Sequence, residues 1–293
     1  MTTRRGIILA GGTGTRLFPT TLSLSKQLLP INDKPMIYYP LSVLMQAGLR
    51  DILIITTPQD RAQFQGTLGD GSQWGVHLSY AIQPEPEGLA QALIIAEDYL
   101  AGAASVLILG DNLFFGDALP SLLAEAELHS TGATLFAYRV AHPERYGVLD
   151  YDATGAVRAI VEKPQQPPSK DAVTGLYFFD HTAPARARTL SPSARGELEI
   201  TCLLETYLHE GSLSVQHMTR GFAWLDTGTP SSLLDAGNFV RTLIERQGQQ
   251  TGSPDEIAFE NRWISADQLL RNAGKIGDND YARYLRSLVD GSS

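Results

Sequence analysis

The 293-residue sequence predicts an α/β fold, namely a Rossmann-like, doubly wound mixed sheet with an added antiparallel hairpin and a small C-terminal helical subdomain. Short apolar runs alternate with longer helical patterns along the first 110 residues, which is the rhythm of βαβ units. The runs at 7–9 and 106–109 are continuously apolar, as expected of parallel strands that helices cover on both faces. Farther along, two strand patterns flank a turn sequence at 152–155, which predicts the hairpin.

The βαβ part is expected to contain strands and helices in strict alternation. In the first helical pattern Ile37, Leu41 and Leu44 fall on one face, so this helix should pack on the sheet. The strands are expected at 6–10, 52–57 and 105–110, and the helices at 35–47 and 88–100.

The second half of the chain predicts a mixed α+β arrangement. The hairpin strands at 146–151 and 156–161 should join the sheet, and the proline-rich 164–168 reads as a surface loop before a strand at 173–179. A helical stretch follows at 231–247, and two further helices are expected at 265–273 and 278–289. We therefore expect a main domain over 1–248 and a helical subdomain over 249–293.

Composition and charge narrow the class of protein. Hydrophobic residues make up 43% and the formal net charge is −9, with Lys and Arg scattered, which argues against a nucleic-acid footprint. The single cysteine, Cys202, allows no intrachain disulfide and suits a reducing compartment. After Arg4 and Arg5 the apolar run is too short for a signal sequence or a membrane span, so we expect a cytoplasmic protein without a membrane partner.

A glycine-rich loop follows the first strand, at the edge where α/β sheets bind ligands. Gly11, Gly12 and Gly14 would let backbone N–H groups approach a polyphosphate, and Arg16 adds a permanent positive charge. The loop lacks the lysine of a P-loop, and Leu17 stands where a dinucleotide fingerprint has its third glycine. A simple tight turn is the alternative reading, but Lys26 adds a second cation nearby and favours phosphate.

Two aspartates end apolar runs. Asp111 follows the strand at 105–110, and Asp226 follows the run at 222–225. Asp111 alone could cap a following helix. Together the two carboxylates form a hypothesis for a magnesium site, because Mg²⁺ is commonly held by one or two carboxylates plus substrate phosphates.

The combination of motifs closely resembles the glucose-1-phosphate thymidylyltransferases. The most specific segments are LAGGTGTRL at 9–17, SKQLLP at 25–30 and DKPMIYYPL at 33–41. The likeness covers nearly the whole chain and continues at 83–84, 88–92, 110–112, 144–148, 162–164, 173–177, 195–201 and 224–229.

The resemblance implies a reaction in which glucose 1-phosphate attacks the α-phosphorus of dTTP and pyrophosphate leaves, with Mg²⁺ as cofactor. It implies catalytic roles for Arg16, Lys26 and Lys163 and metal binding by Asp111 and Asp226. It places nucleotide binding at Leu9, Gly11, Gly12, Gly14, Thr15, Gln27, Gln83, Pro86, Gly88 and Asp111. It places sugar binding at Leu89, Asn112, Gly147, Glu162, Val173, Tyr177 and Arg195.

Many members of the resembled family are tetramers inhibited by a downstream deoxysugar nucleotide, so the resemblance also implies a homo-oligomer, a tetramer, with small-molecule substrates as its other partners. Cys202, Thr20-Thr21 and Pro230 depart from the family pattern, and none has an assigned chemical role.

Three other functions stay open at this point. A uridylyltransferase would use the same loop, cations and aspartates. A sensor of nucleotide sugars could keep the fold without turnover, although the retained Arg16, Lys26, Asp111, Lys163 and Asp226 oppose it. A nicotinamide-dependent dehydrogenase is disfavoured by the missing third glycine and by the absence of an acidic residue at the usual spacing.

Overall fold

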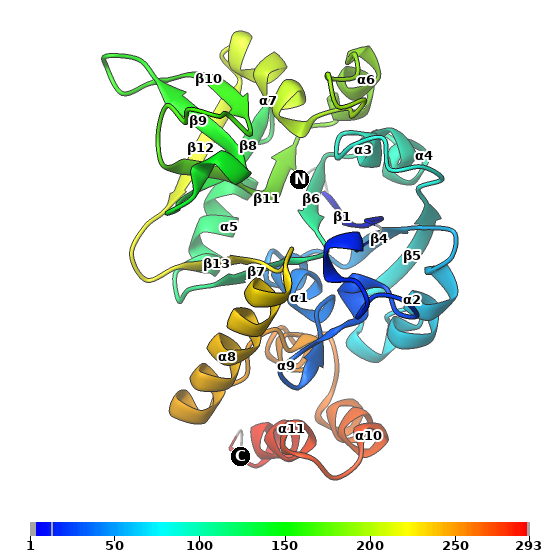
Figure 1. The fold of residues 1–293 in the computed structure, drawn as a ribbon. Helices are drawn as coiled ribbons and strands as arrows, with labels where there is room; N and C mark the ends of the chain where they lie inside the picture. Colours follow the sequence, from blue (N-terminus) through cyan, green and yellow to red (C-terminus); the bar gives the residue numbers. More distant parts are fainter. Residues whose placement is uncertain (1–3, 13, 292–293) are drawn as a thin grey trace.

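The computed structural model describes residues 4–12 and 14–291. Within that part of the chain, the centre of the molecule is a nine-stranded sheet whose main path runs β10-β9-β11-β6-β1-β4-β5 (Figure 1). Off this path, β8 pairs with β11, and β12 pairs with β8. The fold is therefore α/β with a mixed sheet, as the alternating pattern predicts.

The parallel part of the sheet comprises β1 (Arg5–Ala10), β4 (Asp51–Thr56), β5 (His77–Ile82) and β6 (Ser105–Leu109). Strand β1 pairs in parallel with both β4 and β6, so all four strands present their carboxyl ends at one edge. The predicted strands at 6–10, 52–57 and 105–110 are confirmed to within one residue at each end.

The antiparallel part follows in sequence. Strand β11 (Asp171–Phe179) runs antiparallel to β6 and to β8 (Ala133–Arg139), and β12 (Leu213–Met218) pairs in parallel with β8. The predicted hairpin is present as β9 (Gly147–Tyr151) and β10 (Val157–Glu162), joined to the sheet through β11.

Helices cover both faces of the sheet. Alternate residues of β1 therefore pack into two different hydrophobic cores. Ile8 and Ala10 belong to a core with α1 (Tyr38–Gln46), α2 (Arg61–Leu68) and α5 (Leu119–Leu128). Ile7 and Leu9 belong to the opposite core, with α3 (Gln91–Ile95), α4 (Glu97–Leu100), α6 (Ala183–Thr189) and α7 (Ile200–His209). This two-sided covering is why the strands read as continuously apolar.

Two helix predictions need correction. The helix expected over 35–47 begins at Tyr38, because Lys34–Pro35 form β3, which pairs with β2 (Pro30–Ile31). The helix expected over 88–100 is split into α3 and α4, and it starts only at Gln91 since Gly88 has a φ of 110°. Leu89 therefore lies in the loop before the helix.

Short elements line the ligand-binding edge. They are η1 (Thr15–Leu17), η2 (Lys26–Leu28) and η4 (Pro143–Arg145), together with the antiparallel pair β7 (Asn112–Phe115) and β13 (Ala223–Asp226). A further short element, η3 (Ser72–Trp74), precedes β5 and contacts α9 instead. Since β7 directly follows Asp111, the reading of Asp111 as a helix cap is wrong.

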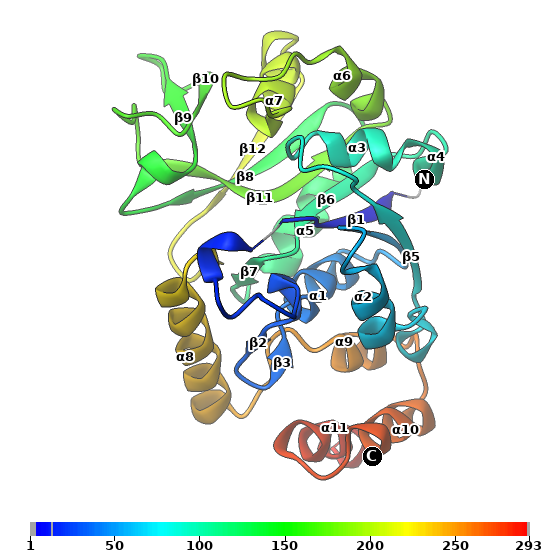
Figure 2. The same ribbon diagram turned by 45° about the vertical axis from the view of Figure 1, so that its right-hand side comes forward.

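The C-terminal region leaves the sheet through α8 (Pro230–Gln247) and ends in α9 (Pro254–Glu260), α10 (Ala266–Ile276) and α11 (Asp280–Asp290) (Figure 2). The predicted helices at 265–273 and 278–289 are confirmed, whereas α9 is not anticipated by the sequence pattern. Ile257, Leu269 and Leu285 pack into the same core as α1 and α2. The boundary after residue 248 remains a proposal.

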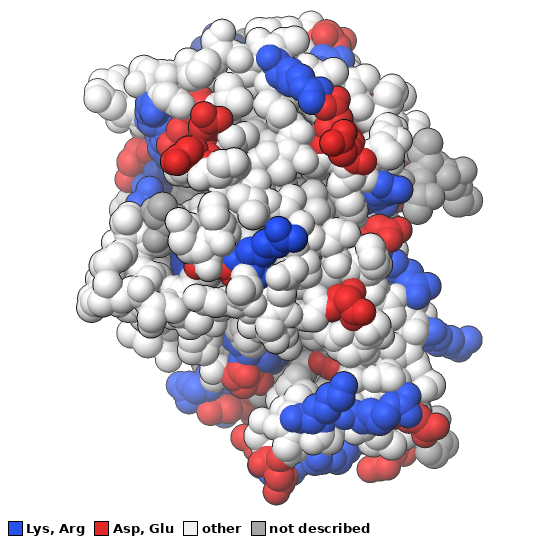
Figure 3. Space-filling view, turned by 90° about the vertical axis from the view of Figure 1, so that its right-hand side faces the viewer, with Lys and Arg blue, Asp and Glu red and all other residues white. Residues whose placement is uncertain are grey.

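The surface carries mixed charge. On the face in Figure 3, basic and acidic side chains are interspersed among uncharged residues. In the described chain, no helix is both long enough and apolar enough to cross a membrane.

Candidate functional site

The residues singled out from the sequence line one continuous cleft at the carboxyl edge of the parallel strands. Three adjoining cavities of about 210, 460 and 280 Å³ make up this cleft, and Leu89 and Asp111 line all three. The first cavity includes Leu9, Gly11, Gly12, Gln27, Gln83, Pro86 and Gly88. The second includes Gly14, Thr15, Arg16, Lys26, Lys163, Arg195 and Asp226, and the third Asn112, Gly147, Glu162, Val173 and Tyr177. Thr13 of the glycine loop lies outside the described residues.

The first cavity is a narrow slot between the glycine loop and the segment after β5. A Cβ added to Gly11 would stand 2.0 Å from Gln83 Oε1, so only glycine allows the loop to approach that amide. Gly88 is equally constrained, because its added Cβ would lie 2.5 Å from the Leu198 backbone. Gly11 and Gln83 are therefore in contact and together form one wall of this slot.

The second cavity gathers cations beside the glycine loop. Gly14 adopts a φ of 63° just before η1, and Thr21 Oγ1 donates to its carbonyl oxygen at 2.9 Å, which aims Arg16 at the cleft. Lys26 is only 8% exposed, and its ammonium forms an ion pair with Asp111. A phosphate entering here would meet these two positive charges and the backbone N–H groups of the loop.

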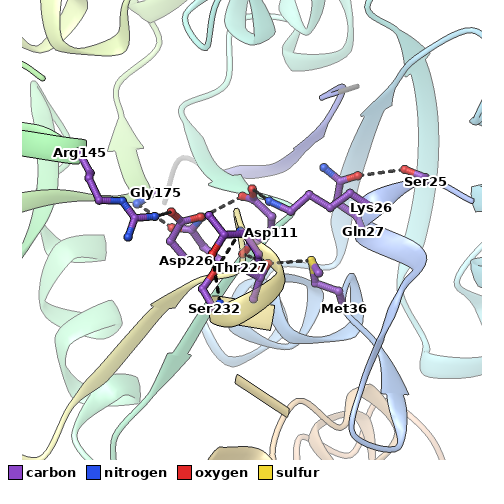
Figure 4. Close-up of polar contacts among 12 residues, drawn as sticks. Ser25, Lys26, Gln27, Met36, Asp111, Arg145, Gly175, Asp226, Thr227 and Ser232 are labelled. Carbon is purple, nitrogen blue, oxygen red and sulfur yellow. Dashed lines mark hydrogen bonds and ion pairs between the residues drawn. The ribbon is translucent and has the colours of Figure 1, made fainter. Parts of the chain in front are cut away.

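The two aspartates meet because β13 pairs with β7, with Asp226 opposite Asn112. Figure 4 shows the side chains of Asp111 and Asp226 in the same site. Thr227 Oγ1 donates to the Asp111 carbonyl oxygen at 2.9 Å and fixes the end of β13 against that turn. Burial raises the pKa of Asp226, and the nearby Asp111 carboxylate raises it further, while Lys26, Arg145 and Arg16 act in the opposite direction. The two carboxylates thus repel each other, and a cation bound between them would offset this repulsion.

Oxygen donors of this kind suit magnesium. Within residues 4–12 and 14–291, no group of three or more His, Cys, Asp or Glu could hold a metal by itself. Two carboxylates with mutual repulsion nevertheless fit Mg²⁺, which usually completes its shell with water and substrate phosphates. The donor set is thus compatible with a metal that binds together with a nucleotide.

The third cavity contains the end of the hairpin. Lys163 directly follows β10, has a φ of 42°, and donates its backbone N–H to the Tyr146 carbonyl oxygen at 3.0 Å. Such a left-handed conformation is uncommon outside glycine and often occurs at functional sites. Glu162 accepts from Thr201 Oγ1 at 3.2 Å, and a Cβ on Gly147 would lie 2.6 Å from the Thr201 side chain.

Arg195 lines the second cavity, not the third, and is held by carboxylates. Its Nη2 lies 2.6 Å from Glu197 and 2.9 Å from Glu199, and 3.7 Å from Glu162. Burial works against the charged guanidinium, but the three carboxylates prevail and raise the pKa of Arg195. Its charge is therefore present at every physiological pH.

Asn112 supports the acidic pair from behind. Its Oδ1 accepts from Gly175 N at 3.1 Å and from Trp224 Nε1 at 2.7 Å, and its Nδ2 donates to Asp111 Oδ1 at 2.9 Å. With 3% exposure, this amide serves mainly to orient Asp111. One N–H of its Nδ2 is already bound to Asp111, so at most one N–H of Asn112 is free to donate to a sugar, the contact that the resemblance implies.

Several cleft residues had no assigned role in the sequence interpretation. Arg145 Nη2 lies 3.8 Å from Asp226 Oδ2, and Thr201, Glu199 and Trp224 line the second or third cavity. All four fall within segments that carry the family resemblance, which was the available signal. Cys202 is partly buried on α7, and burial together with Glu205 raises the pKa of its thiol, so it is a poor nucleophile.

Comparison with known proteins identifies relatives of this chain. A family model described as nucleotidyl transferase matches residues 5–242. A glucose-1-phosphate thymidylyltransferase of Xanthomonas campestris pv. campestris is 57% identical over 289 residues, which cover 99% of this chain and 98% of the relative.

Solved structures agree in fold. A Bacillus anthracis protein, provisionally named glucose-1-phosphate thymidylyltransferase, superimposes with a TM-score of 0.75 and 40% identity, covering 81% of this chain and 95% of that one. A UDP-glucose pyrophosphorylase in complex with UDP-glucose gives a TM-score of 0.71 at 23% identity, covering 82% and 98%, and shows the shared fold alone.

Proposed function

The chain belongs to the nucleotidyl transferase family and, within it, to the glucose-1-phosphate thymidylyltransferases; from this premise we propose that it joins the thymidylyl group of dTTP to glucose 1-phosphate. The products are dTDP-glucose and pyrophosphate. The reaction is a single displacement. A phosphate oxygen of glucose 1-phosphate forms a bond to the α-phosphorus of dTTP while the bond from that phosphorus to the leaving pyrophosphate breaks.

The observation that carries this proposal is the order of the three cavities. The narrow slot at Gly11 and Gln83 suits a base, the cation-rich middle suits phosphates, and the hydroxyl- and carboxylate-lined third cavity suits a sugar. Asp111 and Asp226 border the middle and the third cavity, where the two phosphates would meet.

The reaction needs no general base, because the attacking phosphate is already an anion. The protein has to overcome repulsion between two polyanions and align them for in-line attack. We assign Lys163 to hold the sugar phosphate, and Arg16 and Lys26 to stabilise charge developing on the leaving pyrophosphate. Lys26 is already oriented by Asp111, so little reorganisation is required when substrate binds.

Members of this enzyme class generally use a divalent metal. We propose Mg²⁺, held by Asp111 and Asp226 together with substrate phosphates; when bound it supplies positive charge that lowers repulsion at the α-phosphate. Asn112 and Thr227 would keep Asp111 and Asp226 in register.

On the same premise we propose a cytoplasmic homotetramer. The family resemblance supports the assembly, and the scattered charge supports small-molecule substrates rather than nucleic acid. Light scattering of the purified protein would give the mass of the assembly directly.

The test is pyrophosphate release by purified protein with glucose 1-phosphate and each of dTTP, UTP, CTP, ATP and GTP, with EDTA and no-sugar controls. We expect release that requires both metal and sugar and is fastest with dTTP. Faster turnover of UTP would make the chain a uridylyltransferase, and no release by folded protein with any nucleotide would favour a sensor of nucleotide sugars.

Variants of the two assigned cations sharpen this test. Lys163→Ala and Arg16→Ala should each lower turnover about 10²- to 10³-fold, since each removes a charge from the transition state. Normal turnover by both variants would contradict the assignment.

A further inference from the structure

A chain of side-chain amides connects the base slot to the protein surface, behind the residues that face the cleft. Gln83 follows β5, where its backbone N–H donates to the Thr56 carbonyl oxygen at 2.8 Å. Its Nε2 donates to Gln91 Oε1 at 2.6 Å, and Gln91 Nε2 donates to Glu87 Oε2 at 2.7 Å. Gln83 and Gln91 are only 5% and 9% exposed, so both amides are held within the protein.

The donor-to-acceptor direction of these hydrogen bonds is determined at Glu87, the end nearest the protein surface. Carboxylate oxygens accept hydrogen bonds, so Glu87 requires the NH₂ group of Gln91 to face it. The backbone N–H of Glu87 lies 3.3 Å from Gln91 Oε1 and favours the same orientation. Gln91 must therefore present its oxygen to Gln83, which in turn must present its NH₂ group to Gln91.

The consequence appears at the inner end, in the slot. With its NH₂ group turned to Gln91 and toward the Gly88 carbonyl oxygen at 3.5 Å, Gln83 directs Oε1 at Gly11. Among the described residues, Oε1 has no hydrogen-bond donor. The slot therefore presents a buried acceptor to whatever base enters it.

We propose that Gln91, oriented by Glu87, is a positioning residue that makes Gln83 an acceptor and thereby selects pyrimidines carrying an N3–H. Thymine and uracil donate that hydrogen, whereas N3 of cytosine is itself an acceptor and would face the lone pairs of Oε1. This inference rests on the proposed function, because it takes the slot at Gly11 and Gln83 to be the base site.

Substitutions at position 91 can release or reverse the amide. Gln91→Leu removes the partner and lets Gln83 rotate. Gln91→Lys pairs with Glu87 and donates to Gln83 Oε1, which turns the NH₂ group toward the base. The double variant Glu87→Gln/Gln91→Glu exchanges the acid and the amide. It reverses the hydrogen bond between positions 87 and 91 but keeps Gln83 as the donor to position 91, so it is the matched control.

The readout is the ratio of kcat/KM for dUTP to that for dCTP, because these nucleotides differ only at N3 and C4 of the base. We expect the ratio to fall about 10-fold in Gln91→Leu and about 10- to 100-fold in Gln91→Lys, and to stay within about threefold of wild type in the double variant. The ratio of dTTP to dUTP reports the methyl group and should not change in any variant.

Calorimetric binding of dUTP and dCTP without sugar phosphate separates this inference from the proposed function. Wild-type protein that prefers dUTP in binding but releases no pyrophosphate would overturn the proposed transferase function. The role of Gln91 would then be tested by the ratio of dUTP to dCTP binding in the same variants. Gln91→Leu and Gln91→Lys variants with the wild-type ratio of dUTP to dCTP would overturn the positioning role of Gln91. A wild-type protein that does not distinguish the two nucleotides would overturn it as well. A Gln91→Leu protein with a normal melting temperature and a lowered ratio would rule out a purely structural role.

Discussion

Lys163 combines a predicted catalytic side chain with a backbone conformation that costs free energy. Its φ of 42° is held by the hydrogen bond to Tyr146, at the point where β10 ends. Its Nζ lies 3.5 Å from Glu162 Oε1, with 41% of the side chain exposed to the cleft. The strained turn thus directs an ammonium group into the region assigned to the sugar phosphate.

Replacing Lys163 by glycine or by alanine separates catalysis from strain. Both changes remove the ammonium group and should lower turnover about 10²- to 10³-fold. Glycine should be more stable than alanine by about 0.5–1 kcal/mol, because relief of about 1–2 kcal/mol of strain exceeds the cost of a more flexible unfolded chain, about 0.4–1 kcal/mol. Urea denaturation checks the order, and an alanine variant at least as stable as the glycine variant would contradict the strain argument.

At the scale of elements, the acidic pair depends on the short two-stranded sheet of β7 and β13. The antiparallel register places Asp226 opposite Asn112, and Thr227 joins the end of β13 to the Asp111 carbonyl oxygen. Thr227 is fully buried, so its hydroxyl has no water to replace this partner. The separation of the two carboxylates is therefore controlled by an element outside the main sheet.

Thr227→Val should loosen the acidic pair while preserving side-chain shape. We expect the Mg²⁺ concentration for half-maximal activity to rise about 10-fold, as for other residues that orient metal ligands. Thr229→Val is the control, because Thr229 caps α8 through Ser232 N at 3.2 Å. It should lower stability by about 1 kcal/mol without changing the Mg²⁺ dependence. Equal Mg²⁺ dependence in both variants would argue against the role of Thr227.

At the scale of the whole molecule, buried polar groups join the C-terminal helices to the glycine-loop side. Lys34 is 2% exposed; its ammonium donates to Asp33 at 2.8 Å and to Gln250 at 2.6 Å, and lies 4.8 Å from the centre of the Tyr281 ring. Nearby on α9, burial raises the pKa of Glu256 to about 7, even though the Tyr284 hydroxyl donates to this carboxyl group.

This pKa predicts a pH-dependent stability. Between about pH 4.5 and pH 7 the unfolded chain has released the Glu256 proton while the folded protein keeps it, so the free energy of unfolding falls as pH rises through that window. Glu256→Gln should therefore stabilise the protein by about 3 kcal/mol at pH 8 and hardly at all near pH 4.5.

Chemical denaturation at the two pH values measures the effect. Glu260→Gln, on the exposed side of the same helix, should change stability by less than about 0.5 kcal/mol at both values. A Glu256→Gln variant that gains equally at both pH values would show that the carboxyl group is not the source.

Much of the fold was predictable because its signals are local. The strands at 6–10 and 105–110 are continuous apolar runs, and the hairpin carries its own turn sequence. Helix α9 was missed since its seven residues are too short for a helical period to stand out. The start of α3 was misplaced because the φ of Gly88 depends on its contact with Leu198, far away in the chain.

By itself, the sequence determined the fold class, the glycine loop and the family, because each rests on adjacent residues or on resemblance along the chain. Only the tertiary structure decided that Asp226 stands beside Asp111 and that Glu87 and Gln91 orient Gln83. The first depends on pairing between strands distant in sequence, and the second on the direction of individual hydrogen bonds. Neither leaves a periodic trace in the sequence, because both are properties of atoms brought together by folding.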